Sequence, residues 1–298
     1  MTSTDFGPKV IAIFGPTASG KSALAAELAG KLEGVLVSAD AMQVYKEVPI
    51  LTNQPEEITE LVGIWPLTYE ASVGDYAPRA HGIIDEALSK GQVVILTGGT
   101  GLYMRAALAE LDIPPSVPDE IRKRFETLYD LDKGKTAYNF LSSQDIRAAE
   151  SIHINDRRRV IRALELAEIG RTLRPSSPKI WTDQTRHSTL LIGLEVDPSL
   201  LELRIAARSS LMIKRGAREE AQSALSGSIS STAMRIIGLK EAAELSEQDA
   251  TEAITIRTCR YAAYQRKWMR RIPNICLLDG ATESMSISDE VLKMACLR

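Results

Sequence analysis

One short segment, Gly15–Ser22, limits the fold of this chain more than any other feature of its sequence. It reads GPTASGKS and matches the pattern GxxxxGK(S/T) in full, which forms a glycine-rich loop around phosphate groups when it joins a strand to a helix. The apolar run Val10–Phe14 precedes the loop, and Leu24, Leu28 and Leu32 follow it at the spacing of one helix face. The sequence therefore predicts a P-loop at the first turn of an α/β sheet.

Further apolar runs indicate that this sheet continues along the chain. None of them alternates with polar residues, and helical segments separate them, so we expect a parallel sheet that is covered on both faces. The loops that follow such strands lie at one edge of the sheet, where ligands bind. We expect the further strands at Val35–Val37, Val93–Leu96, Leu190–Leu194 and Ile275–Leu278.

A proline-rich segment, Ile113–Pro118, marks a boundary in the chain. From there to about Trp181 the pattern is helical and includes a helix that begins at Asn155 or Asp156. Leu173–Lys179, with two further prolines, forms the return linker. The predicted fold is α/β, a P-loop NTPase/kinase-like parallel sheet with an inserted all-helical domain. We expect a first core part at 8–114, the inserted domain at 115–185, and a second core part with C-terminal helices at 186–298.

The composition is typical of a soluble globular enzyme. The chain has 298 residues, of which 44% are hydrophobic, and its formal net charge of −3 does not by itself indicate a nucleic-acid binder. Its three cysteines and three histidines are scattered, which argues against a zinc site and a disulfide framework. No apolar run is long enough for a signal peptide or a membrane span. We expect a cytoplasmic protein with no membrane association and no obligate protein partner.

The residue types of the loop explain what it can bind. Glycines let successive backbone N–H groups point at one anion, and the helix N-terminus adds partial positive charge. Lys21 supplies a mobile cation for a terminal phosphate, and Ser22 offers a hydroxyl to Mg²⁺. Because Val93–Leu96 ends in Thr-Gly-Gly-Thr and not in a Walker-B aspartate, the phosphate can be a leaving group without ATP hydrolysis. We expect phosphate contacts from Gly15, Pro16, Thr17, Ala18, Ser19, Gly20, Lys21 and Ser22.

More motifs follow in order, from about residue 10 to residue 271. They are Gly15–Ser22, Ser38–Tyr45, Gly98–Tyr103, Ile152–Asp156, Arg159, Arg162–Glu165, Gly238–Glu241, Tyr261-Ala262, Gln265 and Trp268. As an ordered set they resemble the tRNA dimethylallyltransferase (tRNA isopentenyltransferase) family. The resemblance implies transfer of a dimethylallyl group from dimethylallyl diphosphate to N6 of the adenosine 3′-adjacent to the anticodon in tRNA, with release of diphosphate. It also implies a kinase-like core with an inserted helical domain. The chemistry of the loop makes Mg²⁺ the expected cofactor.

The resemblance points to Asp40, Lys21 and Arg235 as catalytic residues. An exocyclic adenine amine is a poor nucleophile, and a carboxylate within hydrogen-bond reach can accept its proton as the new C–N bond forms. Asp40, at a strand end near the loop, is the candidate base; a turn-forming or helix-capping role and a water-mediated Mg²⁺ contact are the alternatives. Arg235 occupies a position where family members carry an arginine that contacts diphosphate, and a solvent-exposed helix arginine is an equally supported interpretation.

Basic residues alternate with aromatic ones near the C-terminus. The stretch Arg257–Arg271 holds six cations, no acid, and Tyr261, Tyr264 and Trp268; cations neutralise phosphates and aromatic rings stack on bases. Without the resemblance, a solvated basic face with buried aromatic rings would be preferred. Thr100 either contacts the target nucleotide or caps the next helix. The implied tRNA contacts are Asp40, Ala41, Met42, Gln43, Thr100, Arg122, Arg158, Arg159 and Arg162, with the last three expected to face outward.

Other functions remain compatible with the phosphate loop alone. An adenylate (free nucleotide) prenyltransferase or a small-molecule kinase would use the same core, but neither needs the arginines of the inserted helical region. A non-catalytic RNA-binding module is a third possibility. The intact Lys21, Ser22 and Asp40 argue against it.

Overall fold

The computed structural model describes residues 7–115, 117–173 and 182–296. Their strands form one parallel sheet in the order β2-β3-β1-β4-β5. The predicted α/β fold with a parallel sheet is confirmed, and every predicted strand is present. The strands are β1 Val10–Phe14, β2 Val35–Ser38, β3 Val94–Gly98, β4 Thr189–Glu195 and β5 Cys276–Asp279.

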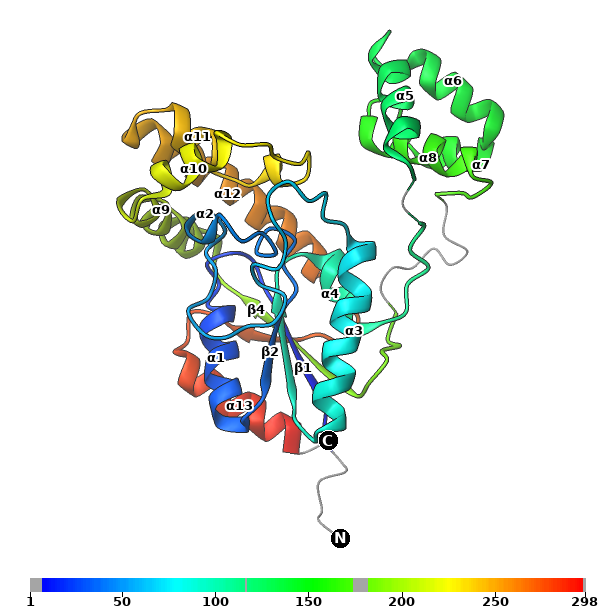
Figure 1. The fold of residues 1–298 in the computed structure, drawn as a ribbon. Coiled ribbons are helices and arrows are strands. Elements are labelled where there is room, and N and C mark those ends of the chain that lie inside the picture. Colours follow the sequence, from blue (N-terminus) through cyan, green and yellow to red (C-terminus); the bar gives the residue numbers. More distant parts are fainter. Residues whose placement is uncertain (1–6, 116, 174–181, 297–298) are drawn as a thin grey trace. The chain divides into compact units, whose positions relative to one another are not determined.

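Helices cover both faces of this sheet (Figure 1). Successive side chains of a strand point to opposite faces, so Ile11 and Ile13 join the core under α1 (Lys21–Leu32) and α13 (Ser284–Cys296). The alternate β1 residues join the larger core under α3 (Val73–Ser89) and α4 (Gly101–Leu108). The sequence did not predict α13, which packs against α1.

A group of helices follows β4 in the chain. It consists of α9 Pro198–Lys214, α10 Ala217–Leu225, the 3₁₀ helix η1 Ala233–Arg235, α11 Leu239–Glu244 and α12 Glu247–Met269. Ser246 begins α12 as predicted, since its side chain accepts a hydrogen bond from the Asp249 amide. The carboxylate of Glu220, in α10, accepts from the amides of Ile50 and Leu51 at 2.9 and 2.7 Å. These bonds fix the short helix α2 (Pro49–Thr52), and with it the segment after Asp40, to the C-terminal helices.

The chain divides into two compact units, Met1–Glu110 with Trp181–Arg298, and Leu111–Ile180. The second unit, which we call the helical unit, has its own core of buried residues that includes Phe125 and Leu164. Where the structure describes it, its regular elements are α5 Asp119–Asp130, α6 Lys135–Gln144, α7 Ile146–Ser151 and α8 Arg157–Glu168. Asp156 caps α8 by accepting from the Arg159 amide. The predicted insertion was 115–185, and most of the expected linker Leu173–Lys179 lies outside the described residues.

Two further observations concern the apolar helices and the cysteines. No helix among the described residues is long and apolar enough to cross a bilayer. Cys259 and Cys276 are free thiols.

Candidate active site

The glycine-rich loop is wound tightly between β1 and α1. Ala18 and Gly20 have positive φ angles of 64° and 94°, and the Ser19 amide donates to the Pro16 carbonyl at 3.2 Å. A Cβ atom on Gly15 would lie 2.6 Å from Ser19 Oγ, so the turn requires glycine there. Lys21 Nζ folds back to 3.4 Å from the Pro16 carbonyl oxygen. The loop therefore has the curled backbone that the sequence predicts for an anion site.

Ser19 differs from the rest of the loop because its hydroxyl is completely buried. Ser19 Oγ has no hydrogen-bond partner among the described residues. It lines a cavity of about 310 Å³ that also borders Gly20, Leu194 and Arg204. A buried hydroxyl without a partner is costly, so this atom has a hydrogen-bonding capacity that the described residues leave unused.

Lys21 and Asp40 lie close enough to interact electrostatically. Burial lowers the pKa of Lys21 from its ordinary 10.5 to about 8, the Asp40 carboxylate acts in the opposite direction, and Arg208 lowers it further. An ammonium group that is partly desolvated and faces another cation is stabilised by any anion that binds beside it. The cation of the loop and the acidic side chain of the next strand thus share the carboxyl edge of the sheet.

Asp40 follows β2 and is partly exposed. One of its oxygens, Oδ1, accepts from the Met42 amide at 2.9 Å, so the turn-forming role considered for this residue is present. Its second oxygen makes no hydrogen bond with the residues that the structure describes. One carboxylate oxygen therefore orients the side chain, and the other remains able to accept a proton.

The hydroxyl of Thr100 links two parts of the site. Thr100 stands at the N-cap position of α4, but its side chain forms no capping hydrogen bond, so the capping interpretation is wrong. Instead, Thr100 Oγ1 accepts from the Ala41 amide and lies 3.3 Å from the Tyr261 hydroxyl. This contact holds the backbone beside Asp40 against α12.

Gln265 braces the same edge from α12. Its Oε1 accepts from the Thr17 amide at 2.8 Å, and its Nε2 donates to the Gly99 carbonyl at 3.0 Å. Only 1% of Gln265 is exposed, and a Cβ on Gly99 would lie 2.1 Å from its Nε2. A single buried amide therefore sets the spacing between the phosphate loop and the end of β3.

Gln43, a predicted tRNA contact, already has partners for its side-chain amide. Its Oε1 accepts from Ser38 Oγ at 2.8 Å, and its Nε2 donates to the Asn53 carbonyl at 2.9 Å. Ala41 and Met42 are partly exposed beside it. The segment 40–43 therefore has a fixed backbone with partly accessible side chains.

Arg208 was missed by the sequence analysis. It lies in α9 and donates to the hydroxyl of Thr17, while burial lowers its pKa and the nearby Asp40 raises it. Arg235, the predicted diphosphate contact, is exposed in η1 and shows no hydrogen bond or ion pair to the loop among the described residues. The described contacts therefore connect Arg208, and not Arg235, with the loop.

The arginines predicted to contact tRNA fall into two groups in the helical unit. Arg158 and Arg159 are exposed, as expected. Arg122 Nε and Arg162 Nη1, by contrast, lie 2.9 and 2.8 Å from the carboxylate oxygens of Glu165, which is 1% exposed. The outward orientation predicted for Arg162 is therefore wrong, because a buried carboxylate needs cationic partners and draws this side chain inward.

The residues available for Mg²⁺ are few. Ser22 is exposed in the first turn of α1, and the described residues contain no group of three side chains able to hold a metal ion. Mg²⁺ commonly binds through one or two protein oxygens together with substrate phosphates and water. The Ser22 hydroxyl fits that mode, in which phosphate oxygens of a ligand and water would supply the remaining ligands.

The fold and the site together define a P-loop α/β protein with an anion loop, a partly desolvated lysine and a carboxylate on one sheet edge. Comparison with known proteins identifies the family. Residues 43–272 match the family model described as IPP transferase, and residues 8–68 match the one described as isopentenyl transferase. The chain belongs to the IPP transferase family, which confirms the resemblance found in its motifs.

Individual relatives match nearly the whole chain. A tRNA dimethylallyltransferase of Corynebacterium jeikeium is 35% identical over 96% of this chain and 98% of its own length. One from Acetivibrio thermocellus is 36% identical over 89% and 90%. The crystal structure of a tRNA isopentenylpyrophosphate transferase from Staphylococcus epidermidis aligns with a TM-score of 0.68 and 29% identity, covering 96% of this chain and 97% of that one.

Proposed function

We propose that this protein transfers a dimethylallyl group from dimethylallyl diphosphate to N6 of the adenosine 3′-adjacent to the anticodon in tRNA. The observation that carries the proposal is that Lys21 follows β1 and Asp40 follows β2 at the carboxyl edge of one parallel sheet, near enough for the Asp40 carboxylate to act on the pKa of Lys21. It brings a site for a leaving diphosphate next to a proton acceptor. The relatives named tRNA dimethylallyltransferase support the choice of both substrates.

The donor half of the reaction belongs to the loop. As the bond between the allylic carbon and oxygen breaks, its electron pair leaves with the diphosphate, so negative charge on that group grows toward the transition state. Lys21, Arg208 and the loop amides other than those of Thr17 and Ser19, which already have partners, would stabilise this charge where it develops, and preorganised groups of this kind contribute about 3 kcal/mol each. Mg²⁺, held by Ser22 and the diphosphate, would supply additional positive charge. Arg235 stays a candidate for the same role.

The acceptor half belongs to Asp40. The N6 lone pair forms the new bond to the allylic carbon, positive charge builds up on nitrogen, and the free carboxylate oxygen accepts the N6 proton. Because Oδ1 is already bound to the Met42 amide, Asp40 has a defined orientation before substrate arrives. Thr100 and the segment 41–43 border this carboxylate and are proposed to hold the target nucleotide.

Exposed side chains in both units would hold the rest of the tRNA: cations in the helical unit and an aromatic ring on α12. Arg158 and Arg159 are exposed at the start of α8. On α12, Tyr264 is 55% exposed and lies edge-on to Trp268, with a centroid separation of 6.3 Å. Cations paired with phosphates and an exposed ring able to stack on a base are the usual elements of single-stranded RNA recognition. We further propose that the enzyme acts in the cytoplasm without an obligate protein partner.

The test uses the purified protein with dimethylallyl diphosphate, Mg²⁺ and unmodified tRNA. We expect a tRNA whose nucleoside digest contains one prenylated adenosine, and no product from a matched tRNA in which guanosine replaces the target adenosine. Parallel reactions with AMP test the free-nucleotide alternative. Prenylated AMP together with unmodified tRNA would overturn the proposal and favour that alternative.

A further inference from the structure

The chain leaves the core unit after Glu110 and is described again from residue 182. These outgoing and returning segments are joined by their backbones, because the Arg186 amide donates to the Leu108 carbonyl at 2.8 Å. Arg105, which is 4% exposed, also holds the returning segment by donating to the carbonyls of Thr182 and Gln184 at 3.2 and 2.8 Å. Both connections to the helical unit are therefore fixed where they meet the core.

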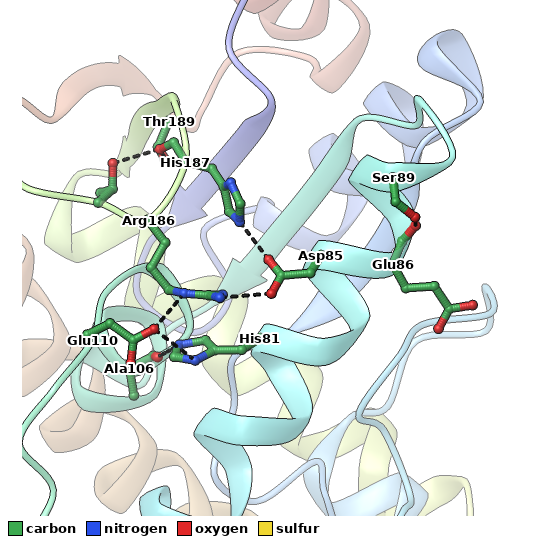
Figure 2. A network of polar contacts seen from close by, with 10 residues as sticks. His81, Asp85, Glu86, Ser89, Ala106, Glu110, Arg186, His187 and Thr189 are labelled. Carbon is green, nitrogen blue, oxygen red and sulfur yellow. Dashed lines mark hydrogen bonds and ion pairs between the residues drawn. The ribbon is translucent and has the colours of Figure 1, made fainter.

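The side chain of Arg186 lies between two carboxylates in this region (Figure 2). Its Nη2 lies 2.8 Å from Asp85 Oδ2 in α3, and its Nε lies 2.8 Å from Glu110 Oε1. His187 Nε2 lies 2.7 Å from the other oxygen of Asp85. The Arg186 side chain is 20% exposed, whereas those of Asp85 and Glu110 are 44% and 77% exposed, so water weakens the pair with Glu110 more than the pair with Asp85. We call the contacts of Arg186 with Asp85 and Glu110 the core clamp.

His81 extends the core clamp to α4. Its Nε2 lies 2.7 Å from the Ala106 carbonyl oxygen, and a carbonyl oxygen can only accept, so Nε2 carries a proton. The other ring nitrogen, Nδ1, lies 3.7 Å from Glu110 Oε1. The last residue of the outgoing core segment is therefore in contact with both Arg186 and His81 (Figure 2).

The helical unit holds the outgoing segment with a clamp of its own. Arg162 Nη2 donates to the carbonyls of Pro114 and Pro115 at 3.1 and 2.7 Å, while its Nη1 is bound to the buried Glu165. We call these contacts the helical clamp. The outgoing chain is thus fixed at Glu110 and again at Pro114, and only residues 111–113 lie between the two clamps.

We propose that Arg186 and Arg162 are positioning residues for tRNA modification, which keep the connection between the two units short. This role rests on the proposed function. A short, fixed tether raises the effective concentration of one binding element at another, and correct placement of the reacting groups lowers the barrier to reaction. RNA held by the helical unit would then present its adenosine to Asp40 more often. Neither arginine touches the donor in this account.

The test compares Arg186→Ala and Arg162→Ala with the wild-type protein. We expect the KM for tRNA to rise by about tenfold in each variant, because loss of a clamp lengthens the free tether several-fold and effective concentration falls roughly as the −3/2 power of tether length. The KM for dimethylallyl diphosphate and the affinity for inorganic diphosphate should not change. Arg186→Lys keeps the charge but cannot bridge both carboxylates, so its KM for tRNA should rise less. This variant replaces Arg186→Ala in the test if the alanine variant does not fold. If these variants lost thermal stability while their KM for tRNA stayed at the wild-type value, the clamps would be structural contacts only, and the proposal would be overturned.

The salt dependence of tRNA binding separates positioning from phosphate contact. The exposed Arg159 is the matched control, and Arg159→Ala should reduce the slope of log K against log salt by about one. Arg162→Ala should weaken binding and leave that slope unchanged; a reduction of about one would restore its predicted phosphate contact and overturn the positioning role. If the wild-type protein binds no tRNA at all, the proposed function fails together with this inference. Normal use of tRNA by both clamp variants would overturn only the inference.

Discussion

The edge of the sheet and the surface of the helical unit use polar side chains in different ways. At the sheet edge, Gln265 is buried and bonded to two loops that are remote from it in sequence. In the helical unit, Arg158 and Arg159 are exposed at the start of one helix. A buried group with fixed partners can stabilise a charge that develops at one point. Exposed cations attract a polyanion over a wide area, and each contributes little.

Two arginines show the same contrast within one residue type. Arg208 is partly buried, contacts Thr17 of the loop and has its pKa lowered by desolvation. The Arg159 side chain is 66% exposed and lies 3.6 Å from the Asp156 carboxylate. Replacement of the first should affect the donor, and replacement of the second should affect only RNA. The predictions below test this division, in order of decreasing effect.

The largest effect on the donor half of the reaction is expected at Lys21. Lys21→Ala removes the mobile cation of the loop, and we expect kcat/KM to fall by about 1,000-fold, the upper range for loss of one preorganised charge-stabilising group. Affinity for inorganic diphosphate, measured by calorimetry, should fall as well. Binding of tRNA in the absence of donor should stay at the wild-type level. A variant that loses tRNA affinity but keeps diphosphate affinity would contradict the division between the two regions.

Replacing Gln265 tests whether the hydrogen bonds that join the phosphate loop to the end of β3 contribute to catalysis. Gln265→Leu has similar volume but leaves the Thr17 amide and the Gly99 carbonyl without their buried partner, at a cost of about 1–3 kcal/mol each. We expect about a tenfold loss of kcat/KM for the donor, together with a lower melting temperature. Gln265→Glu retains the acceptor for the Thr17 amide but places a buried carboxylate oxygen against the Gly99 carbonyl oxygen, so it should lose at least as much as Gln265→Leu. Wild-type kcat/KM in both variants would show that these hydrogen bonds are unimportant.

The pH dependence of donor binding follows from the lowered pKa of Lys21. The folded-state value of about 8 means that the side chain loses its charge as the pH rises through 8. We expect diphosphate affinity to fall by up to about tenfold per pH unit above that value. Lys21→Met supplies the control, since its remaining pH dependence reports only the ionisation of diphosphate. A wild-type profile that parallels Lys21→Met from pH 7 to about pH 9.5 would contradict the account.

The same shift has a consequence for stability. The pKa of Lys21 is about 8 in the folded protein and 10.5 as its ordinary value, so between these values the unfolded chain binds more protons than the folded one. The free energy of unfolding contributed by this group therefore increases as the pH rises through that window. The effect should be absent in Lys21→Met, as measured by urea unfolding at a series of pH values.

The smallest effects are expected at the exposed arginines. Arg158→Ala combined with Arg159→Ala should weaken tRNA binding only a few-fold at moderate salt and reduce the salt slope by about two. Diphosphate affinity should be unchanged, because neither residue belongs to the core unit. An unchanged slope would place the RNA-binding surface elsewhere, with the basic face of α12 as the next region to test.

Much of the fold could be predicted because its determinants are local. The loop Gly15–Ser22 and the run Val10–Phe14 carry their own geometry, and each predicted strand formed. Asp40 could be placed at the rim because parallel strands end at one edge. The position of Arg208 could not be predicted, since no spacing pattern in α9 distinguishes an arginine that turns toward the loop. Gln265 belongs to the ordered set of motifs, but its role was not predicted, because only the fold shows that it lies on the buried face of α12 with Ala262 and Met269.

The error at Arg162 has a similar origin. Its neighbours in sequence suggest an outward basic face, and only the tertiary structure shows that Glu165 is buried and accepts from Arg162 and Arg122. Helix α13 was missed although Asp279-Gly280 and Thr282 precede it and are typical turn and cap residues.

The central claim is that Lys21 and Asp40 serve different halves of one reaction at a shared edge. Asp40→Asn tests it most directly, because the amide keeps the size and the acceptor oxygen of the side chain but cannot take up a proton. We predict that this variant binds inorganic diphosphate as tightly as the wild-type protein and forms almost no prenylated adenosine in tRNA, as measured by mass analysis of the nucleosides. A variant that transfers the group at the normal rate, or that loses diphosphate binding along with transfer, would contradict the account.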